Sequence, residues 1–219
     1  IKRIVLEIVG SFTENVLIAL PLSITSPYLN RIVDIIHETG SVYSSISCQN
    51  EPCIHRVIDG VYSRFRDVDI DVYTNFAISL GPWKESPYFP ATANISNTIG
   101  FSASLRYADL VKESLIRGSE SIISEFIIKV DNVLKLVSEC SNVPYLGIDA
   151  SLSPWFNESV VEVIELLMGS RLGSLGSFTA IYKLNTRIKE LIEGLKIRSI
   201  GYNEVMLPVA EDTVCLLYT

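Results

Sequence analysis

The sequence lacks the features that would place the protein in a membrane or direct it out of the cell. No window of about 18 residues is both apolar and free of charge, as a transmembrane helix requires. Even the stretch 4–22 contains Glu7 and Glu14. We expect no secretory signal either, because Lys2 and Arg3 are followed closely by Glu7 and no small-residue cleavage site closes an apolar run. The sequence therefore predicts a cytoplasmic protein with no membrane partner.

Basic residues are also scarce. The chain has 18 Lys and Arg against 25 Asp and Glu, which gives a formal net charge of −7, and the basic residues are scattered along it. Proteins that bind nucleic acid usually present a basic patch or stripe. We therefore expect no nucleic-acid partner.

The chain has no Cys-x-x-Cys pair. Its four cysteines are Cys48, Cys53, Cys140 and Cys215. In a chain without an export signal this pattern favours reduced thiols over a disulfide framework. His55 lies near the first two cysteines, but the spacing matches no common zinc pattern and a fourth ligand is not in view.

Alternating strand-like and helix-like segments fill the sequence, which is 48% hydrophobic and has ample material for a core. Short apolar runs and period-two patterns predict strands at 4–9, 42–47, 70–78, 143–148 and 204–209. Helical periodicity and capping signals predict helices at 27–39, 54–61, 107–117, 120–139, 154–167 and 178–193, and another starting at 211–212. Strands that alternate with helices predict a largely parallel α/β sheet, in a single domain over residues 1–219.

An irregular stretch at 80–98 mixes aromatic and polar residues. It contains Trp83 and several prolines, and polar residues continue through Asn94 and Asn97 to Arg106. Aromatic walls with a few convergent polar groups are typical of small-molecule pockets. A rigid, proline-braced cover over the core fits the same residues equally well.

The junction 145–155 places an acid and two hydroxyls after a buried strand. Asp149 follows the apolar run, and Ser151 and Ser153 come at alternate positions, with Ser153-Pro154 predicting a helix N-cap. Ligands of open α/β sheets collect beyond the carboxyl ends of strands. The three side chains can bind a metal, a hydroxyl or an amine. They can also be a turn-stabilising aspartate and a helix cap.

Two further segments are candidates for the same rim. Glu211 and Asp212 stand at the end of the last predicted strand, where they can cap a helix or, with Asp149, hold a divalent cation or share a proton. These three acids are the candidate catalytic residues and metal ligands. The loop with Gly173, Ser174, Gly176 and Ser177 precedes a helix and can cradle an anion, although it fits a flexible linker as well.

Several blocks of the sequence resemble a known family. They are SLGPWKESPYFPATAN (79–94), TIGFSASLRYADLV (98–111), YLGIDASLSPW (145–155), RLGSLGSFTAIYKLN (171–185) and MLPVAEDTV (206–214). In content and order they are similar to the uncharacterised domain-of-unknown-function family seven-eleven. Residues 1–78 match only in their strand and helix rhythm.

The resemblance implies a pyruvate-formate-lyase-like barrel, in which two parallel half-sheets are joined antiparallel and wrapped by helices. Family members are about twice this long, so we expect the chain to be the first half or more of the barrel. A homo-oligomer or a second chain that completes the barrel is then the expected assembly. The run 198–202 resembles the glycyl-radical loop only superficially, and we expect no radical machinery.

Two functional hypotheses follow. In the first, a small polar or anionic metabolite, with or without a divalent cation, binds at the strand-end rim, with Arg106 countering a carboxylate or phosphate; no reaction is assigned. In the second, the chain is a non-catalytic ligand-sensing or oligomeric assembly module, in which Trp83 and Trp155 anchor a subunit interface.

Overall fold

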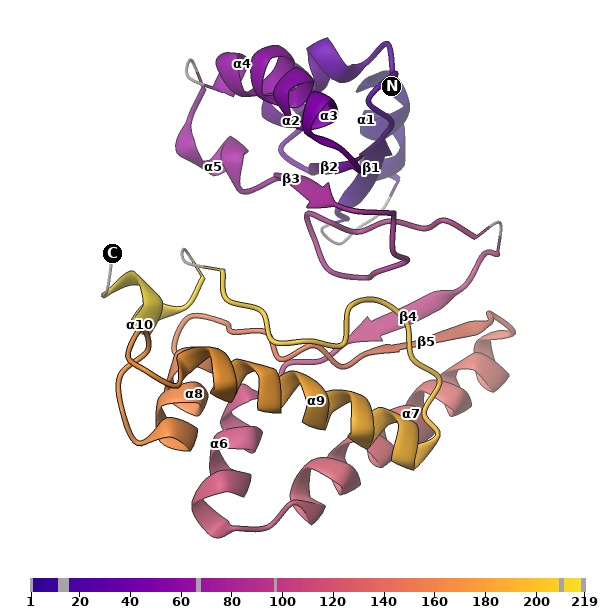
Figure 1. Cartoon of the computed structure of the whole chain (residues 1–219). Coiled ribbons are helices and arrows are strands. Elements are labelled where there is room, and N and C mark those ends of the chain that lie inside the picture. The colour runs from indigo at the N-terminus through magenta and orange to yellow at the C-terminus, as the bar shows by residue number, and fades with distance from the viewer. Residues whose placement is uncertain (1, 12–15, 66–67, 97, 209–210, 218–219) are drawn as a thin grey trace. The chain divides into compact units, whose positions relative to one another are not determined.

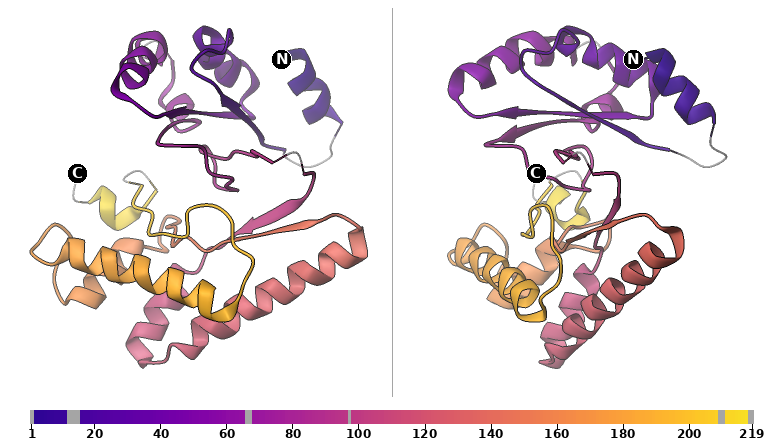
Figure 2. Two further views of the ribbon diagram at one scale, coloured as in Figure 1. Left: turned by 45° about the vertical axis from the view of Figure 1, so that its right-hand side comes forward. Right: turned by 90° about the vertical axis from the view of Figure 1, so that its right-hand side faces the viewer.

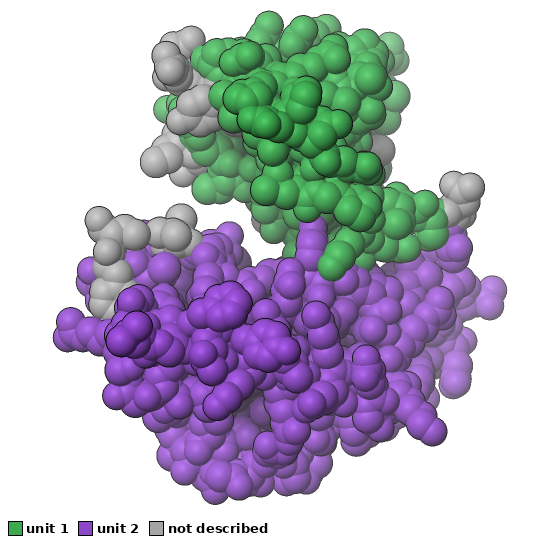
Figure 3. All heavy atoms as spheres, in the orientation of Figure 1, with its two compact units in different colours: residues 1–97 green, residues 98–219 purple. Residues whose placement is uncertain are grey.

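The computed structural model describes residues 2–11, 16–65, 68–96, 98–208 and 211–217. The chain divides into two compact units, residues 1–97 and 98–219 (Figure 3). Each unit has a hydrophobic core of its own. The single domain expected over residues 1–219 stays a prediction.

Unit 1, residues 1–97, is built on a three-stranded parallel sheet of order β1-β2-β3. The strands are β1 (Ile18–Leu22), β2 (Val42–Cys48) and β3 (Phe76–Leu80). Its helices are α1 (Lys2–Gly10), η1 (Leu29–Arg31), α2 (Ile32–Thr39), α3 (Glu51–Val57), η2 (Ile58–Tyr62), α4 (Ser63–Phe65) and α5 (Ile70–Tyr73). Parallel neighbouring strands require a crossover connection, usually a helix, that returns the chain to the end of the sheet where the previous strand began.

Helix α2 shows why this unit folds as it does. Val33 and Ile36 lie on its apolar face and are buried, and Gly40 ends the helix in the left-handed conformation with φ 61°. This face packs against β2, whose Val42 and Ile46 are fully buried (Figures 1 and 2). The predictions for α2, β2 and the helix that begins with α3 are confirmed.

Two strand predictions in unit 1 were wrong. Residues 4–9 belong to helix α1, in which Arg3 pairs with Glu7 one turn later at 2.9 Å. A short apolar run does not by itself distinguish a strand from a helix. The run 70–78 is divided between α5 and β3, and β1 was not predicted at all.

The irregular stretch of unit 1 contacts the sheet of this unit. Ser86 and Ala93 are both buried and form an antiparallel bridge within it. The ring of Phe89 meets Tyr43 of β2 edge-on, with 5.0 Å between the ring centroids. The contacts support the interpretation of this stretch as a brace over the core.

Unit 2, residues 98–219, has a parallel pair of strands, β4 (Phe101–Ser104) and β5 (Tyr145–Asp149). Helices α6 (Ala108–Arg117), α7 (Ser121–Ser141), α8 (Val160–Met168) and α9 (Ser177–Leu195) lie on the same side of this pair (Figure 1). The short α10 (Thr213–Leu216) follows near the end of the chain. The predictions of β5, α6, α7 and α9 are confirmed to within a few residues.

An irregular segment runs beside β5 and its continuation. It makes parallel bridges from Ser199 to Ile148, from Val205 to Leu152 and from Asp212 to Phe156. The predicted strand at 204–209 is therefore reduced to the bridge at Val205, and residues 209 and 210 lie outside the described part. Between bridges the segment leaves the strand path, because Gly201 and Asn203 both have positive φ.

The start of the helix predicted at 154–167 was also wrong. Helix α8 begins at Val160, and its N-cap is Ser159, whose hydroxyl accepts the N–H of Glu162. The residues directly after Ser153 do not enter a helix. Trp155 and Glu158 bond to each other through their backbone groups, and the backbone of Phe156 pairs with Glu211 and Thr213 in the segment beside β5.

The fold class is mixed α/β with parallel strands, as predicted. The strands that the structure describes form two small sheets and do not close into a barrel. Among the helices described, none combines the length and the apolar character needed to cross a membrane.

Candidate functional site

Asp149, the last residue of β5, is directed into the protein. It is 0% exposed. Its Oδ1 accepts hydrogen bonds from the N–H and hydroxyl of Ser151, at 3.0 and 2.6 Å, and from the N–H of Asn203 at 3.1 Å. Its Oδ2 accepts from the N–H of Tyr202 at 3.0 Å. The carboxylate therefore fastens the loop 201–203 to the end of β5.

Gly201 is what lets this loop approach so closely. Its φ is +76°, and a Cβ added there would lie 1.8 Å from Oδ2 of Asp149. Asn203 strengthens the same contact, since its side-chain oxygen accepts the N–H of Ala150 at 3.0 Å. The turn and the carboxylate are thus fitted to each other, and only glycine is compatible with both.

The serines of the junction are also engaged. Ser151 is 0% exposed and its hydroxyl accepts the N–H of Glu204 at 3.2 Å, in addition to its bond to Asp149. The hydroxyl of Ser153 lies 3.4 Å from the carbonyl oxygen of Pro154. Ser151 therefore serves the internal network that was one of the two interpretations of the sequence.

Tyr107 joins this network from the N-cap position of α6, directly before the helix begins. It is buried, and its hydroxyl donates to the carbonyl oxygen of Ala150 at 2.6 Å. Burial raises the pKa of Tyr107 above its ordinary value, and the nearby negative charge of Asp149 raises it further. The phenol is therefore held as a neutral donor.

Asp212 performs a comparable task for two helices. Its Oδ2 accepts the N–H groups of Val160 and Val161 at the start of α8, at 2.9 and 3.2 Å. Its Oδ1 accepts the hydroxyl of Ser159 at 2.7 Å and the N–H of Val214 at 3.1 Å in α10. Such a carboxylate satisfies free N–H groups and favourably meets the helix dipoles. The predicted helix start is confirmed, and one acid caps both helices.

Two of the three predicted acids are therefore engaged in separate structural contacts, and the third is exposed. Asp149 holds the loop 201–203, Asp212 holds α8 and α10, and Glu211 is largely exposed. Partial burial of the carboxyl group raises the pKa of Glu211 above its ordinary value, because it disfavours the charged form. In the described residues no group of three or more His, Cys, Asp or Glu side chains is arranged to hold a metal ion.

Arg106 lies two residues after the end of β4, and its guanidinium is partly exposed to solvent. Its guanidinium forms an ion pair with Glu158, and its Cζ lies 5.1 Å from the centroid of the Trp155 ring. The side chain of Arg106 is 50% exposed and that of Glu158 is 31% exposed. Stacking on the ring and pairing with the carboxylate hold the guanidinium in place while leaving part of it open to solvent.

Trp155 and Phe156 form an aromatic platform beside this arginine. Trp155 is 48% exposed and Phe156 is 64% exposed. Phe156 has φ 49°, a conformation that is uncommon for a bulky residue. Its N–H donates to the carbonyl oxygen of Glu211 at 2.9 Å, and its own carbonyl accepts the N–H of Thr213 at 3.1 Å. These two hydrogen bonds hold the backbone of Phe156 in this conformation.

A cleft of about 360 Å³ opens beside Arg106. It contains one guanidinium and the carboxylates of Asp109, Glu113 and Glu158, and Tyr107, Leu110 and Phe126 complete its lining. The cleft thus combines an apolar wall with charges of both signs, which is the usual composition of a small-ligand site. Arg106 was predicted from the sequence, but Asp109 and Glu113 of α6 were not, because acidic residues on a helix surface have no local sequence signal that marks a site.

The loop between α8 and α9 is held by hydrogen bonds among its own residues. The hydroxyl of Ser177 accepts the N–H of Gly173 at 2.9 Å and donates to the carbonyl oxygen of Ser174 at 2.8 Å. Gly176, with φ +105°, precedes the first turn of α9. Most residues of the loop are exposed. The anion site predicted there stays a prediction.

The two asparagines predicted as ligand-binding residues belong to unit 1. Asn94 is exposed, and its side-chain oxygen accepts the hydroxyl of Ser96 at 3.2 Å. Asn97 lies outside the described residues. Their role in binding stays a prediction.

Comparison with protein families gives a match over most of the chain. The family model described as Uncharacterised ACR (DUF711) matches residues 23–217. The chain belongs to this family. Neither the curated proteins nor the solved structures gave a match to it. Membership in DUF711 agrees with the resemblance noted from the sequence blocks, and it assigns no reaction.

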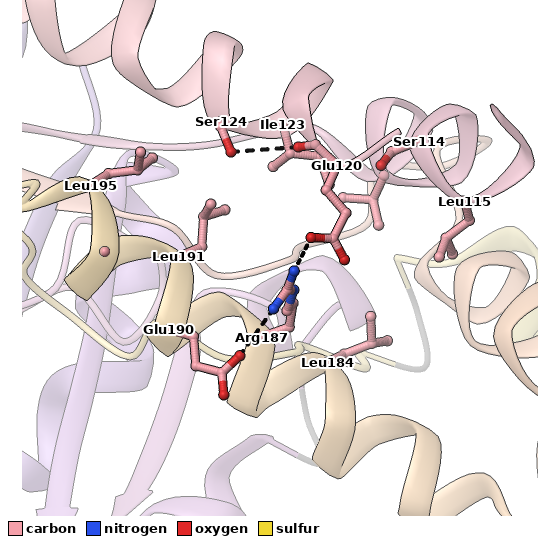
Figure 4. Close-up of a pocket in the computed structure, with 12 residues that line it drawn as sticks. Ser114, Leu115, Glu120, Ile123, Ser124, Leu184, Arg187, Glu190, Leu191 and Leu195 are labelled. Atoms are coloured by element: carbon pink, nitrogen blue, oxygen red, sulfur yellow. Dashed lines mark hydrogen bonds and ion pairs between the residues drawn. The ribbon is translucent and has the colours of Figure 1, made fainter. Parts of the chain in front are cut away.

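This DUF711 chain also contains an apolar pocket that the sequence did not suggest. The pocket has a volume of about 280 Å³ and lies between α6, α7 and α9 (Figure 4). Leu184, Leu191 and Ile123 are among the residues of its wall, and Arg187 stands among them with ion pairs to Glu120 and Glu190 (Figure 4). The pairing keeps the arginine charge compensated beside an apolar surface.

The prediction of reduced cysteines was wrong for one pair in unit 1. Cys48 and Cys53 form a disulfide, with their Cα atoms 5.4 Å apart. The turn from β2 into α3 brings them to this distance, which lies in the usual range for disulfides, although the spacing is not Cys-x-x-Cys. Cys140 and Cys215 are free, as predicted.

Proposed function

We propose that unit 2 binds a small polar metabolite at the cleft beside Arg106, and that the ligand carries a carboxylate or phosphate together with hydroxyl or ammonium groups. The observation that carries the proposal is the half-exposed guanidinium of Arg106, held over Trp155 and against Glu158 at the carboxyl end of β4. Ligands of parallel α/β sheets commonly bind beyond this end of the strands.

The charges of the cleft favour a ligand with groups of more than one kind. Asp109, Glu113 and Glu158 outnumber the single guanidinium, and Glu113 also pairs with Arg117 at 2.6 Å. A simple anion would meet net repulsion there, whereas a ligand that also has hydroxyl or ammonium groups satisfies the carboxylates. An anionic group of the ligand would compete with Glu158 for Arg106.

The buried acids supply the frame of the site in this proposal. Asp149 fixes the loop that runs beside β5, and Asp212 fixes the start of α8, which immediately follows Glu158. A site held by its own hydrogen-bond network loses less entropy on binding than a flexible one. A divalent cation and contacts from the loop 173–177 are further elements of the proposal, as is a cytoplasmic location.

Trp155 offers a direct test because the chain has one other tryptophan, Trp83. In a Trp83→Phe background we would titrate glutamate and, separately, inorganic phosphate while recording the fluorescence of Trp155. We expect saturable binding that is at least about tenfold tighter for glutamate, which carries an ammonium group, than for phosphate. Binding of neither probe would remove the proposal.

Two variants locate the binding. Arg106→Ala should weaken binding by about tenfold or more, because a charge-assisted hydrogen bond is lost. Arg187→Ala is the matched control, since Arg187 is also an exposed, ion-paired arginine of unit 2 and does not line this cleft. Equal affinities for wild type and Arg106→Ala would place the binding elsewhere.

The alternative function is a non-catalytic assembly module. It is favoured by the exposed rings of Trp155 and Phe156 and by exposed apolar side chains on α7, such as Val133 and Leu136. Sedimentation of Trp155→Ala would test it, with circular dichroism as the control for folding. A mass equal to that of the wild type would count against Trp155 as an interface anchor.

We also propose that the two small parallel sheets are parts of a pyruvate-formate-lyase-like barrel that an identical or second chain completes. Support comes from strands that are parallel within each sheet and from helices that flank them. An experimental structure of the assembly in which the strands of the two units lie in unrelated sheets would reject this idea.

A further inference from the structure

We propose that Cys48 and Cys53 form a reversible redox pair in unit 1, which exchanges with an external dithiol through the sulfur of Cys53. This inference is independent of the ligand site in unit 2. It rests on where the two sulfurs lie in the sheet and on which of them can be reached.

The pair occupies the carboxyl end of the central strand. Cys48 is the last residue of β2, and Cys53 lies in the first turn of α3. Asn50 caps that helix, and its side-chain oxygen accepts the N–H of Cys53 at 3.0 Å. The cap fixes the turn between the two cysteines, so it supports their approach with hydrogen bonds that do not depend on the S–S bond.

The two sulfurs differ in accessibility. Cys48 is 1% exposed and belongs to the core of unit 1, whereas Cys53 is partly exposed. Cys53 lines a cleft of about 430 Å³, and Cys48 is not among the residues of its wall. Attack on a disulfide requires that the incoming thiolate reach one sulfur, so access selects Cys53.

The surroundings of Cys53 also favour a thiolate. Arg56 lies one helical turn further on and lines the same cleft. The helix continues without interruption through η2 and α4 to Phe65, so Cys53 stands at the positive end of a helix of several turns. Positive charge and a helix N-terminus are the two features that most often make a cysteine reactive.

The proposed exchange is balanced as follows. One thiolate of the dithiol attacks Sγ of Cys53, the bond between Cys53 and Cys48 breaks, and the sulfur of Cys48 leaves as a thiolate that takes a proton from water. The second thiolate of the reductant then attacks the reductant's own sulfur in the mixed disulfide and releases Cys53. The protein pair gains two electrons, and the dithiol becomes a disulfide.

The main test is a redox titration of the native full chain. The protein is equilibrated with mixtures of reduced and oxidised dithiothreitol, quenched in acid, alkylated with N-ethylmaleimide and mapped by mass spectrometry. We expect Cys48 and Cys53 to gain label together in one two-electron transition, with the far-UV circular dichroism unchanged. Removal of the reductant in the presence of oxidised glutathione should restore the pair.

Two results would overturn the proposal. If the two cysteines gain label only after a denaturant is added, the bond is a structural one that the fold protects. If reduction abolishes the circular dichroism signal, the bond is again structural, because the fold then depends on it. The free Cys140 is the internal control, since it is exposed and should be labelled at every ratio.

A second measurement assigns the reacting sulfur. With oxidised glutathione, Cys48→Ser should form a mixed disulfide at Cys53 at least about tenfold faster than Cys53→Ser does at Cys48, because only Cys53 is accessible. If either variant does not fold, the alkylation rates of the two thiols in the reduced wild type give the same comparison. Equal rates at the two positions would reject Cys53 as the reacting sulfur.

Discussion

The ends of the parallel strands are fastened by different chemistry in the two units. In unit 1, a disulfide joins the end of β2 to the first turn of α3. In unit 2, the carboxylate of Asp149 has the corresponding role at the end of β5, and that of Asp212 holds the starts of α8 and α10. Both accept hydrogen bonds from backbone N–H groups and serine hydroxyls. The first fastener responds to reducing agents. The second depends on two buried charges, each compensated by several donors.

The difference has a consequence for where stability and function lie. A carboxylate that accepts four hydrogen bonds keeps a loop in one position, so the side chains beside it can be presented in a fixed geometry. A disulfide that closes a short loop contributes less to stability than one that closes a long loop. These differences are the basis for the proposals of a pre-formed ligand site in unit 2 and a redox pair in unit 1.

The largest effect that separates the units should come from Asp149→Asn. The amide puts an NH₂ group where one oxygen now accepts hydrogen bonds, which leaves at least one donor unsatisfied and removes the charge. We expect the free energy of unfolding of unit 2 to fall by about 4 kcal/mol. Urea unfolding with region-resolved hydrogen exchange would measure it.

Asp109→Asn is the control for Asp149→Asn, because Asp109 is an exposed aspartate of the same unit and should change stability by less than about 0.5 kcal/mol. Equal effects of the two substitutions would show that the buried network does not hold the unit together.

A smaller loss is expected from Gly201→Ala. The new Cβ would collide with the carboxylate of Asp149, and φ of +76° is strained for alanine. We expect a loss of about 3 kcal/mol, from overpacking and from the left-handed backbone together. Gly169→Ala isolates the backbone part, because Gly169 has φ +69° and an added Cβ there meets nothing within 4 Å. That control should lose only about 1 kcal/mol, as measured by thermal or urea unfolding.

Removal of the disulfide should have a moderate effect that is confined to unit 1. The two cysteines are separated by 5 positions, and the loop-entropy relation gives about 2 kcal/mol for a loop of that size. The double variant Cys48→Ser, Cys53→Ser should therefore increase hydrogen exchange in β2 and α3, while β5 and α8 keep their protection. Cys140→Ser, at a free and exposed position, should change neither unit. Loss of protection in β5 would mean that the disulfide also stabilises unit 2.

The smallest effect concerns pH and should be confined to unit 2. The pKa of Tyr107 is raised from 10.0 in the folded state, so the folded protein keeps this proton when the unfolded chain has begun to lose it. The contribution is fully present below pH 10 and is lost as the pH rises above it. Between pH 9 and pH 11 we expect Tyr107 to contribute a loss of about 1.4 kcal/mol, since one pH unit above the unfolded pKa corresponds to about that free energy.

Tyr107→Phe should reduce this alkaline slope in urea unfolding, although the variant loses the hydrogen bond to Ala150 at every pH. The pKa of Tyr145 is also raised, chiefly by burial, so Tyr145→Phe should reduce the remaining slope. A slope that neither variant changes would assign the alkaline effect to other groups.

Much of the secondary structure could be predicted because its signals are local. The helices α6, α7 and α9 have apolar periodicity within their own residues, and Asp212 lies directly before the helix that it caps. Predictions failed where a short apolar run fits two structures. Residues 4–9 form a helix, and the residues after Ser153 pair with a distant segment instead of starting one.

The candidate site was predictable only in part. The sequence singled out Asp149, Ser151, Asp212 and Arg106, but it could not tell which of them face solvent. Asp149 binds the N–H of Tyr202, 53 residues away, and Arg106 pairs with Glu158, 52 residues away. Burial and pairing over such separations depend on how β5 and the segment beside it pack, and no pattern within a window of residues encodes that.

The sequence by itself determined the α/β class, the acidic balance, the main helices of unit 2 and the family resemblance, since all of these depend on composition, periodicity or blocks of neighbouring residues. The tertiary structure alone decided that Asp149 and Asp212 face inward, that Arg106 rests on Trp155, and that Cys48 and Cys53 are joined. The physical reason is that a charge or a thiol acquires its role from the partners that packing brings to it. Those partners come from other strands and helices.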